Sequence, residues 1–216
     1  MSHRSPPISV RPLTPERWHD LVTLFGCRGC SVARNCWCMA YRESGTPTPQ
    51  IGKLREQRRR ALRNLVEAGT VPGLLAYRSS GSEEAVPVGW ISLGPREEYA
   101  KLQRSPIMKP VDDQPVWSVV CFFVHPEHRG AGVATALLNA GIRHARDHGA
   151  RLLEAYPVDD TARRDDKAMW FGAKRMYDRA GFHEVARRKP TRPVVRKALR
   201  GAARHRAAAS PHQSSH

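Results

Sequence analysis

The sequence lacks several features that would each point to a different class of protein. It contains no run of about 18 apolar residues, the length that a membrane-spanning helix needs. Residues 1–12 contain no apolar stretch of the kind found in secretory signals. The chain has only five cysteines and no internal repeat. We therefore expect a cytoplasmic protein with reduced thiols, without disulfides and without a membrane partner.

Negative charge is scarce and unevenly distributed. The chain has 36 lysines and arginines against 20 acidic residues, a formal net charge of +16. Residues 186–216 hold nine of the basic residues and no acidic one. This charge suits an anionic partner, but we favour a general bias toward arginine as its explanation, and we do not expect a nucleic-acid partner. We predict one domain over residues 1–199 and a basic, disordered tail over residues 200–216.

The pattern of apolar residues predicts a single mixed α/β domain. Thr14 and Pro15 are typical of a helix start, and Gly26 ends that helix. The other predicted helices cover residues 50–68, 132–148 and 165–180. The predicted strands cover residues 74–78, 86–93, 116–124, 152–156, 182–187 and 194–199. Residues 95–114 are polar and contain prolines, so we expect a loop there.

The most informative segment runs from Val119 to Leu138. A continuous apolar strand leads through a short loop into Arg129-Gly-Ala-Gly-Val-Ala134, which opens an amphipathic helix. Glycines let backbone N–H groups approach an anion, and the positive end of the helix dipole favours phosphate oxygens. This pattern predicts a phosphate-bearing ligand bound by the main chain. A glycine-rich turn without a ligand is the alternative.

Two well-known phosphate-binding motifs do not fit this segment. A P-loop requires Gly-Lys-Ser/Thr, which the chain lacks. A Rossmann site places its first glycine directly after the strand, whereas residues 125–129 intervene here. The part of the chain after the helix is also too short for the rest of a doubly wound sheet.

The segment resembles the signature of the GNAT superfamily, which comprises acyl-CoA-dependent N-acetyltransferases. The signature Gln/Arg-x-x-Gly-x-Gly/Ala stands here as Arg129 to Ala134. A second GNAT signature is a helix ending in an aromatic residue before Gly-Phe, present as Tyr177 and Gly181-Phe182. The chain is most similar to a subset with three further segments, which are Cys36-Trp-Cys38, Pro115–Phe122 and Tyr156-Pro-Val-Asp159. The resemblance implies a GNAT fold, with a mostly antiparallel sheet whose parallel strands splay apart.

The resemblance also implies an activity and a binding site. The substrate amine would attack acetyl-CoA directly in a ternary complex. The main chain of Phe122, Phe123 and Val124 would bind the pantetheine arm. The phosphates would be held at Arg129, Gly130, Ala131, Gly132, Val133, Ala134 and Thr135. Trp170 replaces an asparagine that often contacts the cofactor in this family.

The resemblance assigns the proton donor more firmly than the base. Tyr177 matches the residue that usually protonates the leaving thiolate. Many relatives carry a basic carboxylate on the strand before the signature, and this strand has none. Glu154 is our first candidate for the base, although it would equally suit a pairing with an arginine on the solvent face of its strand. Asp112, Asp113, Asp159 and a water relay are further alternatives.

The acceptor amine is left open by the sequence. Polyamines, antibiotics, amino acids and protein amines all fit as acceptors. The sequence is also compatible with a homodimer. A non-catalytic acyl-CoA-binding regulator, or a protein associated with nucleic acid or aminoacyl-tRNA, is the alternative function. Deletion of residues 200–216 is expected to leave turnover unchanged.

The segment from Cys27 to Cys38 holds four of the five cysteines. Its two cysteine pairs stand closer together than in structural zinc sites, so we predict no metal there. We expect a packed connection between two helices on the acceptor side of the fold, with Cys36, Trp37 and Cys38 at the substrate pocket. Cys121 is expected to be a small core residue, because direct transfer needs no acyl-enzyme.

Overall fold

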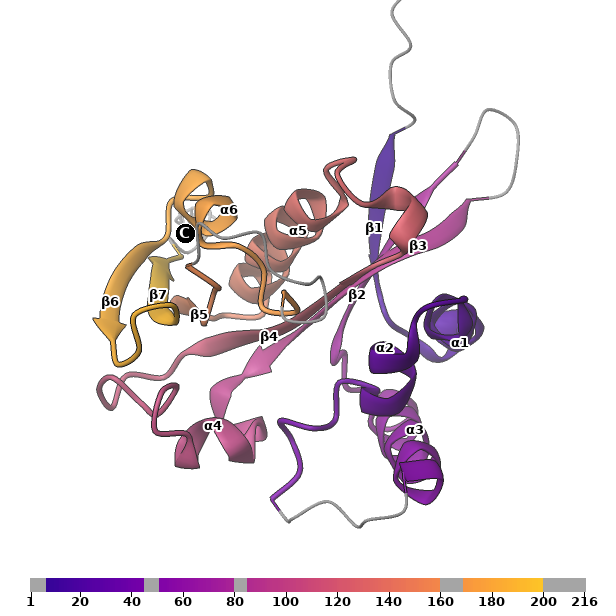
Figure 1. The fold of residues 1–216 in the computed structure, drawn as a ribbon, viewed down its shortest axis with the longest axis horizontal. Coiled ribbons are helices and arrows are strands. Elements are labelled where there is room, and N and C mark those ends of the chain that lie inside the picture. Colours follow the sequence, from indigo (N-terminus) through magenta and orange to yellow (C-terminus); the bar gives the residue numbers. More distant parts are fainter. Residues whose placement is uncertain (1–6, 45–50, 80–84, 160–168, 200–216) are drawn as a thin grey trace, which may run out of the picture.

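The computed structural model describes residues 7–44, 51–79, 85–159 and 169–199, and within them a seven-stranded sheet has helices on both faces (Figure 1). The strands are β1 (Ile8–Pro12), β2 (Gly73–Arg78), β3 (Val86–Pro95), β4 (Trp117–Val124), β5 (Leu152–Ala155), β6 (His183–Arg187) and β7 (Pro193–Ala198). Their order in the sheet is β1-β2-β3-β4-β5-β7-β6. Only β4 and β5 pair in parallel, which confirms the predicted mixed sheet.

The helices confirm the predicted order and add elements that the sequence did not predict. The α-helices are α1 (Trp18–Gly26), α2 (Ser31–Cys36), α3 (Ile51–Glu67), α4 (Ala100–Arg104), α5 (Val133–Asp147) and α6 (Lys174–Arg179). Three 3₁₀ turns, η1 (Pro15–Arg17), η2 (Arg96–Glu98) and η3 (Pro126–His128), precede α1, α4 and α5. The prediction of a loop over residues 95–114 is corrected by η2 and α4. Residues 165–168 of the predicted helix over residues 165–180, and the whole predicted tail, lie outside the described residues. The described part of that helix is shorter than predicted, because residues 169–173 are not helical and only α6 is.

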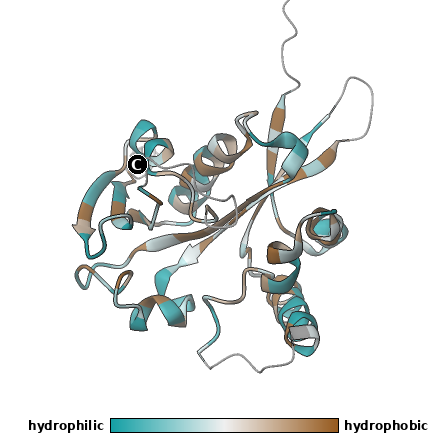
Figure 2. Ribbon diagram, in the orientation of Figure 1, coloured by the Kyte–Doolittle hydropathy of each residue, from teal (hydrophilic) through white to brown (hydrophobic). Residues whose placement is uncertain are grey.

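Alternate side chains of the sheet pack into two cores on opposite faces. Leu74 and Ala76 of β2 join the core under α5, together with Ile91 and Val119. The intervening Leu75 and Tyr77 join the core under α1, α2 and α3. Figure 2 shows apolar residues along the central strands and polar residues on the outer faces of the helices. This alternation is the period of two that defines a strand.

One glycine sets how closely α5 approaches the sheet. A Cβ atom on Gly89 of β3 would lie 2.6 Å from Cγ1 of Val133 and 3.1 Å from Cδ1 of Leu137. The first turn of α5 therefore rests directly on the backbone of β3. No helix among the described residues is long and apolar enough to cross a bilayer.

Candidate active site

The strands β4 and β5 form a fork at the centre of the sheet. They pair only from Trp117 to Val119, opposite Leu153 to Ala155. Beyond that point no strand among the described residues pairs with β4 on this side up to Val124, and the backbone N of Phe122 bonds the carbonyl oxygen of Trp170 instead. The pairing of β4 with β3 also shifts register after Cys121, so that Val120 opposes no residue of β3. The fork leaves main-chain groups of β4 without a partner strand, and this is where the pantetheine arm is expected.

The glycine loop beyond β4 has the geometry of an anion cradle. Gly130 and Gly132 adopt φ angles of +74° and +82°, which favour glycine. An added Cβ at either position would meet nothing within 4 Å, so the loop faces open space. The first hydrogen bond of α5 runs from N of Ala136 to O of Gly132. The preceding N–H groups therefore have no partner within the helix and point to its open N-terminal end.

Tyr177 lies beneath the fork and is completely buried. Its hydroxyl donates a hydrogen bond of 2.9 Å to the carbonyl oxygen of Phe171. Burial raises its pKa well above the usual range, so it keeps its proton at neutral pH. The neighbouring carbonyl, that of Trp170, accepts from the backbone N of Phe122 at 2.6 Å. Two consecutive carbonyls thus engage the predicted proton donor and one of the predicted pantetheine contacts.

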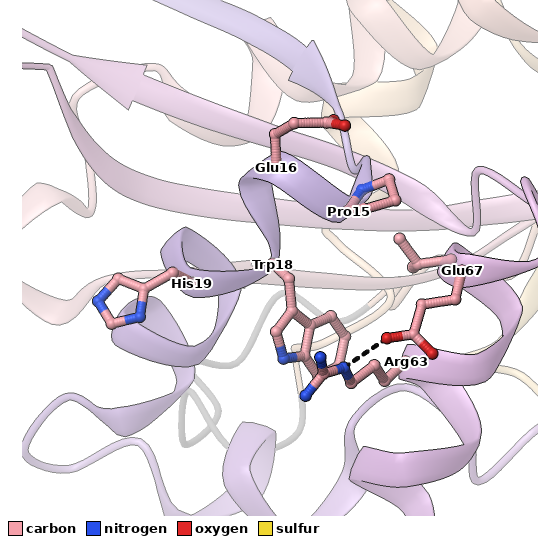
Figure 3. Close-up of a pocket in the computed structure, with 7 residues that line it drawn as sticks. Pro15, Glu16, Trp18, His19, Arg63 and Glu67 are labelled. Carbon is pink, nitrogen blue, oxygen red and sulfur yellow. Dashed lines mark hydrogen bonds and ion pairs between the residues drawn. The ribbon is translucent and has the colours of Figure 1, made fainter.

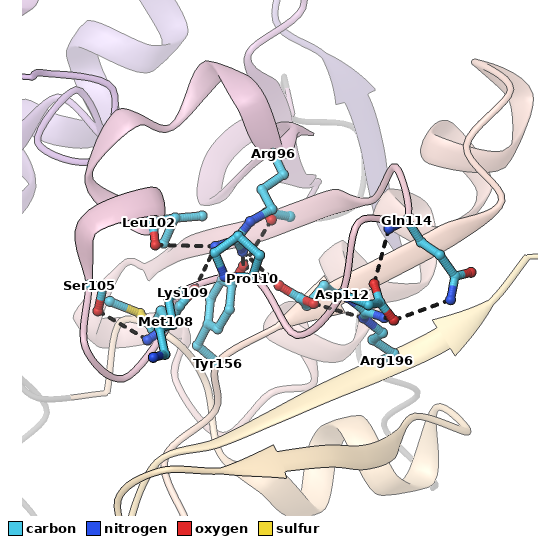
Figure 4. Close-up of polar contacts among 12 residues, drawn as sticks. Arg96, Leu102, Ser105, Met108, Lys109, Pro110, Asp112, Gln114, Tyr156 and Arg196 are labelled. Carbon is cyan, nitrogen blue, oxygen red and sulfur yellow. Dashed lines mark hydrogen bonds and ion pairs between the residues drawn. The ribbon is translucent and has the colours of Figure 1, made fainter.

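Glu154 is also completely buried, and its carboxylate is fully engaged by Arg96, Tyr156 and Arg196, three residues that Figure 4 labels. One oxygen accepts from Arg96 at 2.7 Å and from the Tyr156 hydroxyl at 2.6 Å. The other oxygen accepts from Nε of Arg196 at 2.8 Å. The expected pairing with arginine is present, but inside the protein and not on a solvent face. A carboxylate held by two guanidinium groups is poorly placed to take a proton from a substrate.

The same network fixes the loop that follows α4. Arg96 also donates to the carbonyl oxygens of Leu102 and Met108, at 3.2 and 2.6 Å. Arg196 forms a second ion pair with Asp112, which lowers the pKa of that carboxyl group. Asp159 pairs with Arg187 at 2.6 Å, whereas Asp113 is exposed. In the described part of the chain, no hydrogen bond joins Tyr177 to any of the carboxylates that the sequence proposed as the base.

The Cys36-Trp37-Cys38 segment has an unusual backbone. Trp37 and Cys38 adopt φ angles of +47° and +51°, which cost about 1 kcal/mol or more per non-glycine residue. The Trp37 ring is buried, stacks on Trp18 and contacts Phe25 edge-on. The Cys38 sulfur accepts a hydrogen bond of 3.2 Å from the Trp90 indole. The ring of Trp37 belongs to the core. The place of the Cys36-Trp37-Cys38 segment at a substrate pocket therefore stays a prediction.

The thiols of this segment are held in their protonated form. Hydrogen bonding with the Cys38 thiol and burial raise the pKa of Cys36. The pKa of Cys38 is raised mainly by hydrogen bonding with the Cys121 thiol. Protonated thiols are poor nucleophiles and poor metal ligands. In the described part of the chain, no group of three or more histidine, cysteine or acidic residues is arranged to hold a metal ion.

One expectation about the cysteines was wrong. The structure joins Cys27 and Cys30 in a disulfide, with 5.5 Å between their Cα atoms. The turn between α1 and α2 brings these residues together, because N of Cys30 bonds O of Cys27 at 3.2 Å. Gly29 supports this turn with a φ of +82°. The sequence analysis excluded disulfides because it expected a cytoplasmic protein. It did not consider that this turn brings Cys27 and Cys30 close enough to pair.

A small pocket of about 220 Å³ lies on the other side of the sheet from α5, between η1, α1 and α3 (Figure 3). It is lined by Pro15, Glu16, Trp18, His19, Arg63, Val66 and Glu67. Arg63 and Glu67 form an ion pair of 2.8 Å within this lining. None of these residues belongs to the fork, the glycine loop or α6. The pocket is therefore separate from the candidate active site.

Several site residues were missed by sequence reasoning. Arg96, Ser118 and Arg196 surround Glu154 and Tyr156, but each comes from a different strand or turn. Phe171 was not considered, although its carbonyl is the partner of Tyr177. The signal that could have found them is the presence of charged residues within otherwise apolar strands, because a buried charge needs a partner. Glu154 and Arg196 are such residues, and they face each other in the adjacent strands β5 and β7.

A splayed sheet with a glycine loop at the start of α5 is the arrangement expected of an acyl-CoA-binding transferase. The sequence model of the acetyltransferase (GNAT) family matches residues 42–182, which is more than half of the chain. The chain belongs to this family, and it is an acyltransferase with acetyl-CoA as co-substrate. No curated protein matches the chain at a significant level.

The chain is also similar to solved structures, at low sequence identity. A Corynebacterium glutamicum protein, described as histone acetyltransferase HPA2 and related acetyltransferase, is 20% identical with a TM-score of 0.49. The match covers 93% of this chain and 99% of that one. The PaiA N-acetyltransferase of Thermoplasma acidophilum, in complex with coenzyme A, is 16% identical with a TM-score of 0.48 and coverages of 89% and 99%. A chain of the NatC complex, bound to a Gag peptide and CoA, is 12% identical with a TM-score of 0.50 and coverages of 89% and 99%.

Proposed function

We propose that this acetyltransferase moves the acetyl group of acetyl-CoA directly to a primary amine of a small molecule or protein within a ternary complex. The observation that carries the proposal is the continuity of the β4 fork with the glycine cradle at α5. The fork offers strand-edge groups to an extended pantetheine arm, and the cradle offers N–H groups to the phosphates. A ligand that joins an extended amide chain to a pyrophosphate would place the amide chain at the fork and the pyrophosphate at the cradle.

The cradle comprises the main chain from Arg129 to Thr135, including Ala131, Val133 and Ala134. Gly130 and Gly132 supply left-handed backbone conformations that a side chain would strain. Phe122, Phe123 and Val124 supply the edge of β4. The side chain of Phe122 points into the core beside Tyr177, with 6.3 Å between the ring centroids. The pantetheine arm would therefore end close to the Tyr177 hydroxyl.

In the proposed reaction the amine nitrogen attacks the thioester carbonyl carbon. A C–N bond forms, the C–S bond breaks, and the electron pair of that bond leaves on the CoA sulfur. Tyr177 donates its proton to this thiolate, and the amine loses one proton. Tyr177 must first release the carbonyl of Phe171, which is its partner in the structure. The high pKa of Tyr177 keeps the proton available over the whole neutral range.

In the proposed reaction the amine proton does not pass to Glu154. Glu154 is the carboxylate nearest to the fork in the sheet, but both its oxygens are engaged by arginines. We therefore favour a water relay as the route of the amine proton. Glu154 then acts as a positioning residue, which holds Arg96 and Tyr156 beside the fork.

The test is release of free thiol from acetyl-CoA with a panel of amines, including polyamines, amino acids and lysine peptides. Release that depends on both the amine and the protein supports the proposal. A Gly132→Ala variant is the matched control. Loss of this glycine should raise the KM for acetyl-CoA. Retained CoA binding without release for any amine would overturn the proposal and favour a non-catalytic acyl-CoA-binding regulator.

A further inference from the structure

Two histidines at the C-terminal end of α5 have the spacing of a metal-binding pair. His144 lies in the last turn of the helix, and His148 follows its last residue. Positions four apart lie on one face of a helix. The centroids of the two imidazole rings are 4.0 Å apart, with 45° between the ring planes. Pairs of this spacing supply two of the ligands in helical zinc sites.

The tautomer of His148 is fixed by the backbone. Its Nδ1 lies 2.8 Å from the carbonyl oxygen of His144. A carbonyl oxygen only accepts, so Nδ1 must carry the proton and Nε2 must carry the lone pair. A second-shell hydrogen bond from the other ring nitrogen to a carbonyl is the usual arrangement of a metal-bound histidine. His148 is exposed, so this lone pair is accessible from solvent.

His144 presents a nitrogen that has no partner within the described residues. Its Nε2 is shielded from solvent and forms no hydrogen bond there. A buried polar atom of this kind costs about 1–3 kcal/mol and calls for a missing partner, such as an ion. Trp117 of β4 covers the pair, with its ring centroid 5.8 Å from that of His144 and 5.9 Å from that of His148.

The electrostatic setting favours a cation at this place. The C-terminal end of a helix carries about half a negative charge. Asp147 lies between the two histidines in the chain, and its carboxylate acts on His144. Arg146 forms an ion pair with Asp147, at 3.3 Å. At about 1.5 Å per residue, this end of α5 lies roughly 20 Å from the glycine cradle at its start.

We propose that His144 and His148 form a binding site for a late first-row divalent metal ion, such as Zn²⁺ or Ni²⁺. The Nε2 atoms of both imidazoles are the protein ligands, and water fills the remaining positions. Imidazole nitrogen selects these ions over Mg²⁺ and Ca²⁺, which prefer oxygen ligands. With two protein ligands the metal is exchangeable and is not required for folding. The site is distinct from the acetyl-transfer machinery.

The experiment is calorimetric titration of the untagged, full-length protein with Ni²⁺ and, separately, with Zn²⁺. The wild type is expected to bind one equivalent more than the His144→Gln/His148→Gln double variant. The exposed His148→Gln single variant, which leaves the core intact, should weaken binding at that site by about tenfold or more. A His125→Gln/His128→Gln variant controls for the other neighbouring histidine pair, whose ring centroids are 5.6 Å apart, and should keep the equivalent.

A second control keeps the number of histidines and changes only their spacing. In Arg146→His combined with His148→Gln, the pair is two residues apart and lies on different faces of the helix, and the tautomer-fixing bond of His148 is lost. This variant should lose the equivalent. The proposal is overturned if wild type and double variant bind equal amounts of Ni²⁺, or if Mg²⁺ binds as tightly as Ni²⁺. Acetyl transfer should be unchanged in the double variant, so failure here leaves the proposed function untouched.

Discussion

At the scale of single residues, the hydroxyl of Tyr177 is the group whose removal should matter most for turnover. We expect Tyr177→Phe to lower kcat by about 100-fold, because the CoA thiolate then leaves without a positioned proton donor. Acetyl-CoA should bind with nearly unchanged affinity, since the expected contacts to the arm and phosphates come from the main chain. Steady-state kinetics and CoA calorimetry measure the two quantities.

The matched control for this variant is Tyr77→Phe. Tyr77 is also buried, and its hydroxyl bonds Asp20 at 2.6 Å on the other face of the sheet. Loss of the Tyr77 hydroxyl also removes one buried hydrogen bond, but it should leave kcat within about a factor of two of the wild-type value. An unchanged kcat in Tyr177→Phe would remove this tyrosine from the mechanism.

Glu154 offers a second prediction at this scale, in which stability and not catalysis is the primary readout. Glu154→Gln would leave the guanidinium groups of Arg96 and Arg196 buried without their shared carboxylate. Breaking a buried ion pair from one side costs about 3–5 kcal/mol, so the free energy of unfolding should fall by that order. Urea denaturation measures it.

Glu184→Gln is the contrasting variant, because Glu184 pairs with Arg187 on an exposed strand. Its loss should cost less than about 1 kcal/mol. If Glu154→Gln keeps full stability and loses only turnover, Glu154 is the base after all, and the water relay is wrong.

At the scale of elements, the contact between β3 and α5 joins packing to phosphate binding. Gly89→Ala would place a methyl group against Val133 and Leu137, in the first turns of α5. Overpacking of this kind costs about 1–3 kcal/mol and shifts the backbone. Because the cradle is the start of the same helix, the KM for acetyl-CoA should rise together with the loss of stability. Thermal denaturation and kinetics of one variant test both effects.

The control for this prediction is Gly149→Ala, at the other end of α5. That glycine has a φ of +82° but open space around it, so a methyl group strains the backbone without pushing the helix off the sheet. It should lower stability and leave the KM unchanged. An equal rise of the KM in both variants would mean that stability alone controls the cradle.

The elements that the sequence predicted are those whose own segment carries a clear apolar period. The apolar stripe of α3 and the alternation in β3 have enough residues to establish a period. The strand β1 was missed because Pro7 and Pro12 bracket an alternation of only four residues. Proline is tolerated there because β1 is an edge strand, which is a property of the sheet and not of the segment.

The short helices α2 and α4 were missed for a related reason. Each has five or six residues, too few for a helical period. Contacts from distant parts of the chain hold them, such as the bond from the backbone N of Lys101 in α4 to the carbonyl oxygen of Tyr41 and that from Arg58 to the carbonyl of Asn35 in α2. The candidate site divides in the same way. Its main-chain cradle follows from a contiguous motif, whereas the surroundings of Glu154 depend on which strands are neighbours.

At the scale of the whole molecule, the division of the chain into a domain and a tail can be tested by truncation. The family match ends at residue 182, and the last strand, β7, ends at Ala198. Deletion of residues 200–216 should therefore leave kcat and the melting temperature unchanged. A large loss of turnover would show that the basic tail takes part in binding a substrate.

The stability of the whole fold should also depend on pH through His144. Burial, followed by the charge of His148, lowers the pKa of His144 from 6.5 to about 4, and Asp147 opposes this shift. The unfolded chain takes up a proton near pH 6.5, whereas the folded one resists it until about pH 4. The contribution of the neutral ring is therefore complete above pH 6.5 and is lost as the pH falls toward 4.

The measurement is urea unfolding of the wild type and of His144→Gln, with EDTA present so that no metal ion contributes. The glutamine does not titrate, so the difference in unfolding free energy between the two proteins isolates His144. This difference should shrink steadily between pH 6.5 and pH 4, in favour of the variant at the acid end. A difference that stays constant over this range would mean that His144 titrates alike in the folded and unfolded chains, and that its packing against Trp117 does not exclude the charged form.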